Sequence, residues 1–95
     1  MKNYAKVLIE KKGLSSLQES ISIGKQVMER KLAAYQKKAV QFEQAEGMDT
    51  EAFIVSFNKG ELGDNKKWIK WDHAANVVNL LKKKLGDLES LKYEY

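Results

Sequence analysis

Apolar or small side chains recur at steps of three and four residues along the first half of the chain. This spacing constrains the fold more than any other feature, because it places the side chains on one face of a long α-helix. The stripe consists of Leu17, Ile21, Gly24, Met28, Leu32, Tyr35, Ala39 and Phe42. The chain contains no proline, the residue that most strongly breaks helices. The pattern therefore predicts an all-α protein.

The first long helix is predicted over residues 16–46. Ser16 and Glu19 form the S-x-x-E pattern of a capping box, in which both side chains bind free amide groups of the first turn. Gly47 follows the stripe, and glycine readily takes the left-handed conformation that ends helices. Gly24 interrupts the stripe at a cost of about 1 kcal/mol relative to alanine, so continuity through this position stays open.

A short helix is predicted over residues 50–58. Asp49 before it is a favourable N-cap residue, because its carboxylate accepts hydrogen bonds from the first turn. Met48 and Phe53 have the spacing of a hydrophobic staple, which packs the residue before the cap against the first turn of the helix. Phe53, Ile54 and Phe57 define the face of this helix that we expect to be buried.

A second long helix is predicted over residues 65–85, with Asp64 as its N-cap. Three lysines followed by Gly86 are typical of a helix end, although a continuation to residue 91 also fits the pattern. We expect ten residues of the three helices to form a core or a partner interface. They are Leu32, Tyr35, Phe42, Phe53, Phe57, Trp68, Trp71, Val78, Leu81 and Leu85.

Residues 1–13 give no single answer. The alternation of Ala5, Val7 and Ile9 is that of a strand, whereas other spacings in the segment fit a short helix. Gly13 ends the segment in either case, and we favour the helix.

The two long helices do not fit inside a globule of this size. A helix of about 30 residues is about 45 Å long, whereas the radius of gyration of a compact domain of this length is near 13 Å. The sequence thus predicts a single domain built as an extended helical hairpin, with the short helix between its arms. Further apolar residues lie beside the stripe of the first long helix, at Val27, Ala34 and Val40, and beside the core positions of the second, at Val77 and Leu80. This second apolar surface indicates an oligomeric bundle or a protein partner.

The composition argues against several classes of function. Cysteine is absent, so thiol chemistry and disulfides are excluded. The single histidine, His73, falls opposite the tryptophans, and no nucleophile, base and orienting group can be assembled around it. We therefore expect a non-enzymatic protein without catalytic, cofactor-binding or metal-binding residues. No apolar run approaches the roughly 20 residues that span a bilayer, so we expect a cytoplasmic protein without membrane contact.

Nucleic-acid binding is the alternative that the lysines leave open. The chain has 17 Lys and Arg against 13 Asp and Glu, a net charge of +4. Lys66 and Lys70 interleave with Trp68 and Trp71, as they would in a site where bases stack on aromatic rings. At about 100° per residue, however, these lysines point away from the tryptophans. Ordinary amphipathicity explains the interleaving, and nucleic acid is the less favoured partner.

The stretch from Gly47 to Trp71 resembles a family of small prokaryotic helical antitoxins. In that family a Met-Ser/Thr-x-Glu-x-Phe element precedes a Gly-Glu-Leu-Gly-Asp segment, an aromatic residue and a tryptophan. The matching residues here are Met48, Thr50 (one place later than usual), Glu51, Phe53, Phe57, Gly60, Glu61, Leu62, Gly63, Asp64, Trp68 and Trp71. The family continues with further acidic residues after the aspartate, whereas Asn65, Lys66 and Lys67 follow here.

The resemblance covers about a quarter of the chain closely, and the flanking helices only in character. It implies an antitoxin that neutralises a toxin encoded beside it by direct binding. The residues themselves imply a protein–protein interaction module. A nucleic-acid-associated helical adaptor and a plain structural oligomer are the alternatives.

Overall fold

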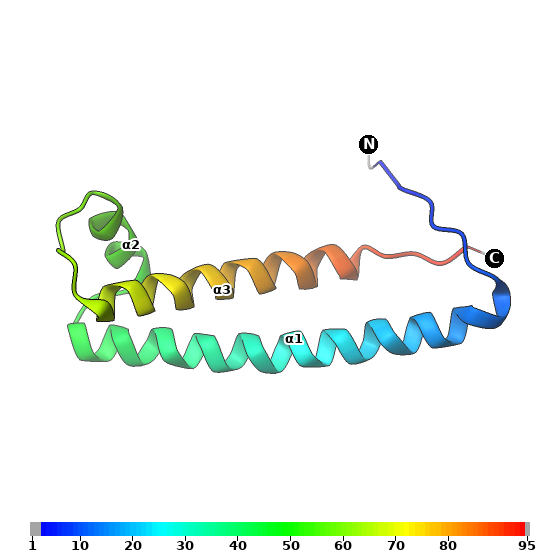
Figure 1. The fold of residues 1–95 in the computed structure, drawn as a ribbon, viewed down its shortest axis with the longest axis horizontal. Helices are drawn as coiled ribbons and strands as arrows, with labels where there is room; N and C mark the ends of the chain where they lie inside the picture. Colours follow the sequence, from blue (N-terminus) through cyan, green and yellow to red (C-terminus); the bar gives the residue numbers. More distant parts are fainter. Residues whose placement is uncertain (1–2, 95) are drawn as a thin grey trace.

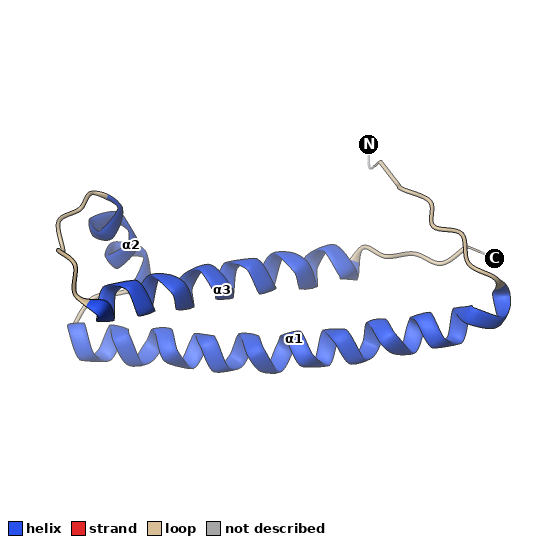
Figure 2. Cartoon of the chain, viewed as in Figure 1, coloured by secondary structure: helices blue, strands red, loops and turns tan. Residues whose placement is uncertain are grey.

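The computed structural model describes residues 3–94, and this part of the chain is helical without any strand. Two long helices, α1 (Lys11–Glu46) and α3 (Lys66–Glu89), lie side by side as a hairpin. The short α2 (Thr50–Asn58) packs at the closed end of this hairpin (Figure 1). Figure 2 shows that the remaining chain forms the connections and the two terminal segments. The predicted all-α hairpin with a short helix between long arms is thus confirmed.

The hairpin is elongated because each arm is a single uninterrupted helix. Its extents are 54 × 29 × 18 Å and its radius of gyration is 18.4 Å, well above the roughly 12–13 Å of a compact domain of this length. Gly24 and Gly86 both lie inside helices, so neither residue interrupts its arm. The sequence left the end of this helix open between residue 85 and residue 91, and the structure favours the continuation, because α3 passes through Gly86 and ends at Glu89.

The start of α1 differs from the sequence prediction. Residues 3–10 form no helix, and α1 begins at Lys11 without a side-chain cap at Glu10. Ser16 and Glu19 lie inside the helix with exposed side chains, so the capping box is wrong. The helix extends further because Leu14 and Leu17 continue the half-buried stripe by one more turn.

Gly13 does not end a segment, as the sequence had indicated, but lies in the first turn of α1. A Cβ atom at this position would approach the Cδ1 atom of Ile9 to 3.1 Å. The glycine therefore leaves room for the Ile9 side chain to fold back over the start of the helix.

The two ends at the α1–α2 connection agree with the prediction. Gly47 closes α1 in the left-handed conformation, with φ of 67°, and its amide donates to the Glu43 carbonyl at 2.9 Å. The Asp49 carboxylate accepts from the Ala52 amide at 2.7 Å and caps α2. The observed bounds of α2 are those predicted, because both ends carry a local signal. Asp49 lies directly before the start of the helix, and Gly60 follows shortly after its end.

The N-cap of α3 is Asn65 and not Asp64. The Asn65 side chain accepts from the Lys67 amide at 3.0 Å, and the Trp68 amide donates to the Asn65 carbonyl at the same distance. Gly63, with φ of 77°, turns the connector just before this point. Asp and Asn are almost equally good N-caps, so the geometry of the connector decides between the two neighbours.

This assignment predicts different effects for two adjacent substitutions. Asn65→Ala is expected to lower the free energy of unfolding by about 1 kcal/mol, because it removes a cap. Asp64→Ala is expected to change it by less than about 0.5 kcal/mol, as for an ordinary surface position. Equilibrium urea denaturation of both variants measures the difference. A larger loss at Asp64 than at Asn65 would place the helix start one residue earlier.

Candidate functional site

The core lies at the closed end of the hairpin, where side chains from all three helices meet. Trp71 and Phe53 are both 0% exposed, and their rings stack with centroids 4.0 Å apart and planes at 3°. Phe42 of α1 stacks on Trp71 with centroids 5.6 Å apart. Trp68 stacks on Phe53 at 5.8 Å. Aromatic stacking therefore ties α1, α2 and α3 together.

A polar chain runs through the same junction. The indole Nε1–H of Trp71 donates to the Thr50 hydroxyl at 3.1 Å, so the polar atom of this buried ring is satisfied. The Thr50 amide in turn donates to the Glu43 carboxylate at 2.8 Å. At the same end, Lys67 forms an ion pair with Glu46 at 3.1 Å. Thr50 thus links α1 to α3 through α2, a role that its place in the sequence did not predict.

The other predicted core residues are less buried than the aromatic cluster. Leu81 is buried, together with Ala74 and Ala75 of the same helix. The rest of the predicted set is half-buried along the hairpin, at Leu32, Tyr35, Phe42, Phe57, Val78 and Leu85. The stripe predictions therefore selected residues of the seam, where Leu81 is buried and the others are half-buried, whereas the fully enclosed rings of Trp71 and Phe53 lie at the closed end.

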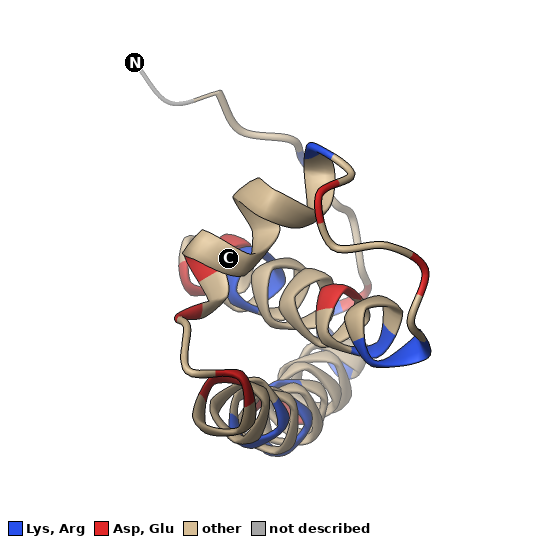
Figure 3. Ribbon diagram, turned by 90° about the vertical axis from the view of Figure 1, so that its left-hand side faces the viewer, with Lys and Arg blue, Asp and Glu red and all other residues tan. Residues whose placement is uncertain are grey.

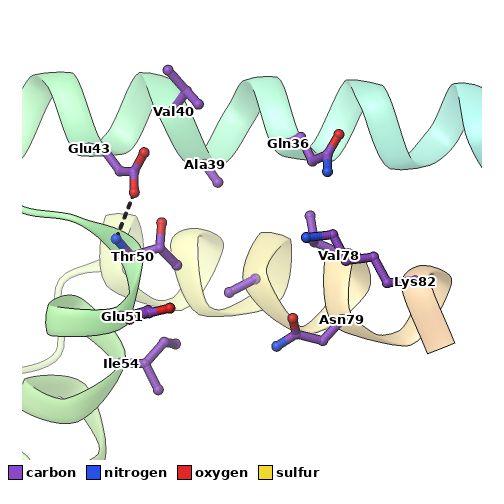
Figure 4. A pocket seen from close by; sticks show the side chains of 11 residues that line it. Gln36, Ala39, Val40, Glu43, Thr50, Glu51, Ile54, Val78, Asn79 and Lys82 are labelled. Atoms are coloured by element: carbon purple, nitrogen blue, oxygen red, sulfur yellow. Dashed lines mark hydrogen bonds between the residues drawn. The ribbon is translucent and has the colours of Figure 1, made fainter.

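One groove opens where α1 and α3 meet α2, and we call it the α2-side groove. It has a volume of about 610 Å³, and its apolar lining includes Val40, Ile54 and Val78. Two carboxylates, Glu43 and Glu51, also line it (Figure 4). Figure 4 shows Glu43 bridged to Thr50 at one end of this groove, while Lys82 lies toward the other.

A second groove lies on the other flank of the α1–α3 seam, and we call it the Tyr35 groove. It has a volume of about 830 Å³ and is lined by Tyr35, Lys38, Gln41, Phe42, Ala45, Ile69, Lys70, His73 and Ala74. None of these residues lines the α2-side groove. The helical rotation of about 100° per residue sets the two linings on different flanks of each helix.

Charges surround the closed end of the hairpin. Figure 3, viewed toward this end, shows acidic and basic stretches on the helices and on the connection between α2 and α3. Lys70 lines the Tyr35 groove and Lys66 does not, although both side chains are exposed. The two lysines predicted for nucleic-acid contact are therefore not joined in one groove.

The tryptophans do not offer platforms for bases. Trp71 is 0% exposed and Trp68 is 8% exposed, so neither ring has an open face. The interleaving of lysines and tryptophans follows from the amphipathic rotation of α3, as the sequence had indicated. The lone histidine, His73, is exposed, and its ring forms a T-shaped contact with the Tyr35 ring, with the two centroids 5.7 Å apart.

Residues 3–94 bring no three side chains of the His, Asp or Glu types into a group that could hold a metal ion. Within the same range, no helix combines the length and the apolar character needed to cross a bilayer. No family model, curated protein or solved structure matches this chain.

Proposed function

We propose that this chain is a non-enzymatic protein–protein interaction module that acts as an antitoxin, neutralising a toxin by direct binding. The observation that carries the proposal is the apolar surface left open along both arms of the hairpin. Six large apolar side chains of the three helices are about half exposed, at Ile23, Val27, Val40, Val55, Ile69 and Leu80. An apolar surface spread over an elongated molecule is what a partner or a second copy would cover.

The position of the core supports the same proposal. The aromatic cluster packs the three helices together at the closed end, while the arms beyond it are joined by a seam of mostly half-buried side chains. A packed end with two extended arms offers a long surface for a partner to contact. The finer step, from interaction module to antitoxin, rests on the resemblance of the segment from Gly47 to Trp71.

The test of the antitoxin proposal uses the protein encoded beside this chain in its genome. Expression of that neighbour alone is expected to arrest growth, and co-expression with this chain is expected to restore it. The two purified proteins are expected to form a complex in size-exclusion chromatography. A neighbour that is harmless, or a complex that does not form, would overturn the proposal.

The open surface also predicts self-association of the chain in the absence of a partner. Ile23 and Val27, which are 54% and 56% exposed, lie on the half of α1 remote from the closed end. The chain is expected to sediment as an oligomer at micromolar concentration. Aspartate at both positions is expected to shift it toward monomer, because burying those charges opposes association. Sedimentation velocity over a wide concentration range measures this, and a wild-type monomer throughout would contradict it.

A further inference from the structure

We propose that the Tyr35 groove binds an acidic amphipathic helix of a protein partner. This inference rests on the proposed function, because it names the surface and the chemistry by which such a module would recognise its partner. The partner helix would place apolar side chains on the floor of the groove and Asp or Glu side chains along its flanks.

The charged side chains that line the groove are lysines. Lys38, Lys70 and His73 line it, and no carboxylate does. Within residues 3–94 no ion pair joins Lys38 or Lys70 to an acidic side chain. The Lys38 ammonium lies 4.5 Å above the centre of the Tyr35 ring, which holds it at the edge of the groove. The groove therefore presents two lysines that have no acidic partner among residues 3–94, and one of them, Lys38, is held over an aromatic ring.

The floor of the groove is apolar. Phe42 and Ala45 of α1 face Ile69 and Ala74 of α3 across it, and Ile69 is 58% exposed. A groove between two helices is a common seat for a third, amphipathic helix, whose apolar residues fill it. Cations beside an apolar floor select a helix that carries carboxylates beside its apolar stripe, because complementary charge favours the correct partner and orientation.

The α2-side groove differs from the Tyr35 groove in the charges that line it. This difference makes the assignment of the acidic helix to the Tyr35 groove specific. Glu43 and Glu51 line it, together with one cation, Lys82. An acidic helix would meet two carboxylates there, and like charges brought together across an interface oppose binding. The charge difference between the two grooves directs an acidic helix to the Tyr35 groove.

A second copy of the chain is a less suitable occupant of the Tyr35 groove. Of the two grooves, only the α2-side groove combines carboxylates with apolar side chains, and it is a different face of the molecule. Contact between two different faces is heterologous and does not close into a twofold dimer.

A nucleic acid is also less suitable than an acidic helix. Base stacking needs an open ring face, yet the Phe42 ring is stacked on Trp71 and the Tyr35 ring is covered by Lys38. The apolar floor contributed by Ala45, Ile69 and Ala74 offers no partner for phosphates.

The experiment titrates the isotope-labelled full chain with a synthetic helical peptide that carries Leu and Ile on one face and Glu beside them. We expect amide chemical-shift changes to centre on the Tyr35 groove. A peptide with every Glu replaced by Lys is expected to bind at least about tenfold more weakly, because it loses its attraction to the two exposed lysines.

Substitutions on the chain provide the matched comparison. The double variant Lys38→Glu with Lys70→Glu is expected to raise the Kd of the acidic peptide about tenfold or more, and the corresponding Gln variant by less. Lys82→Glu, in the α2-side groove, is expected to leave the Kd unchanged. All these side chains are exposed, so we expect the variants to keep the wild-type circular dichroism and unfolding midpoint.

Four results would each overturn the inference. They are the absence of peptide binding, equal binding of the lysine peptide, binding of a single-stranded oligonucleotide at these residues in place of the peptide, and amide chemical-shift changes in the groove that depend on chain concentration without peptide.

Growth rescue separates this inference from the proposed function. Rescue that survives the double Glu variant removes the Tyr35 groove as the docking site and leaves the antitoxin function standing. Failure of the wild-type chain to rescue removes the antitoxin function, while the peptide titration still decides the groove.

Discussion

Trp71→Ala is expected to lower the free energy of unfolding by about 3–5 kcal/mol, the range found for large aromatic side chains removed from a core. Trp71 is 0% exposed and stacks on both Phe42 and Phe53, so its removal leaves a cavity where the three helices meet. The hydrogen bond from its indole to Thr50 is lost as well. Small domains are stable by only about 5–15 kcal/mol, so the variant is expected to be largely unfolded or close to it.

Urea denaturation followed by circular dichroism measures the effect. Ile69→Ala, two positions away on the same helix, is the matched control, because its side chain is 58% exposed. We expect the control to change the free energy of unfolding by less than about 0.5 kcal/mol. A Trp71→Ala variant that stays within about 1 kcal/mol of wild type would show that the closed end is not the stabilising core.

Phe53→Ala is expected to have a similar effect, about 3–5 kcal/mol, with a different structural consequence. Phe53 is the one fully enclosed residue of α2, and it contacts Trp68, Trp71 and Phe57. The helix has only nine residues, and isolated helices of this length are not stable in water. Without its anchor, α2 is expected to lose structure before the two arms separate.

Amide hydrogen exchange distinguishes this local effect from global unfolding. In the Phe53→Ala variant we expect the amides of α2 to exchange faster than those of α1 and α3. Val55→Ala on the exposed side of α2 serves as the control, since the Val55 side chain is 54% exposed. Protection of α2 equal to that of the arms would mean that other contacts hold this helix in place.

The helices themselves were largely predictable from the sequence. The three-and-four spacing identified both arms, because a stripe of that period has no other simple way to be buried. The bounds of α2 were correct because Asp49 and Gly60 act locally, within one turn of the helix ends. The end of α1 at Gly47 was correct for the same reason.

The starts of the arms were predicted less well, for a physical reason. Ser16 and Glu19 have the residues of a capping box, yet α1 already begins at Lys11, and the half-buried Leu14 continues its apolar stripe before them. Asp64 and Asn65 have nearly the same capping chemistry, so sequence alone could not choose between them. In both cases packing or connector geometry decided among local options of similar energy.

At the candidate site, too, some features follow from the sequence alone and others from the tertiary structure. The sequence by itself determined the order and approximate length of the two arms and of the short helix between them, and that both tryptophans belong to one buried face, although the helix favoured within residues 1–13 is absent from residues 3–10. These properties follow from local periodicity and end signals.

Only the tertiary structure decided that Thr50 joins Glu43 to Trp71, because hydrogen bonds between helices depend on their relative rotation. It also decided that Lys38 and Lys70 share a groove free of carboxylates, since residues on separate helices become neighbours only when the hairpin closes.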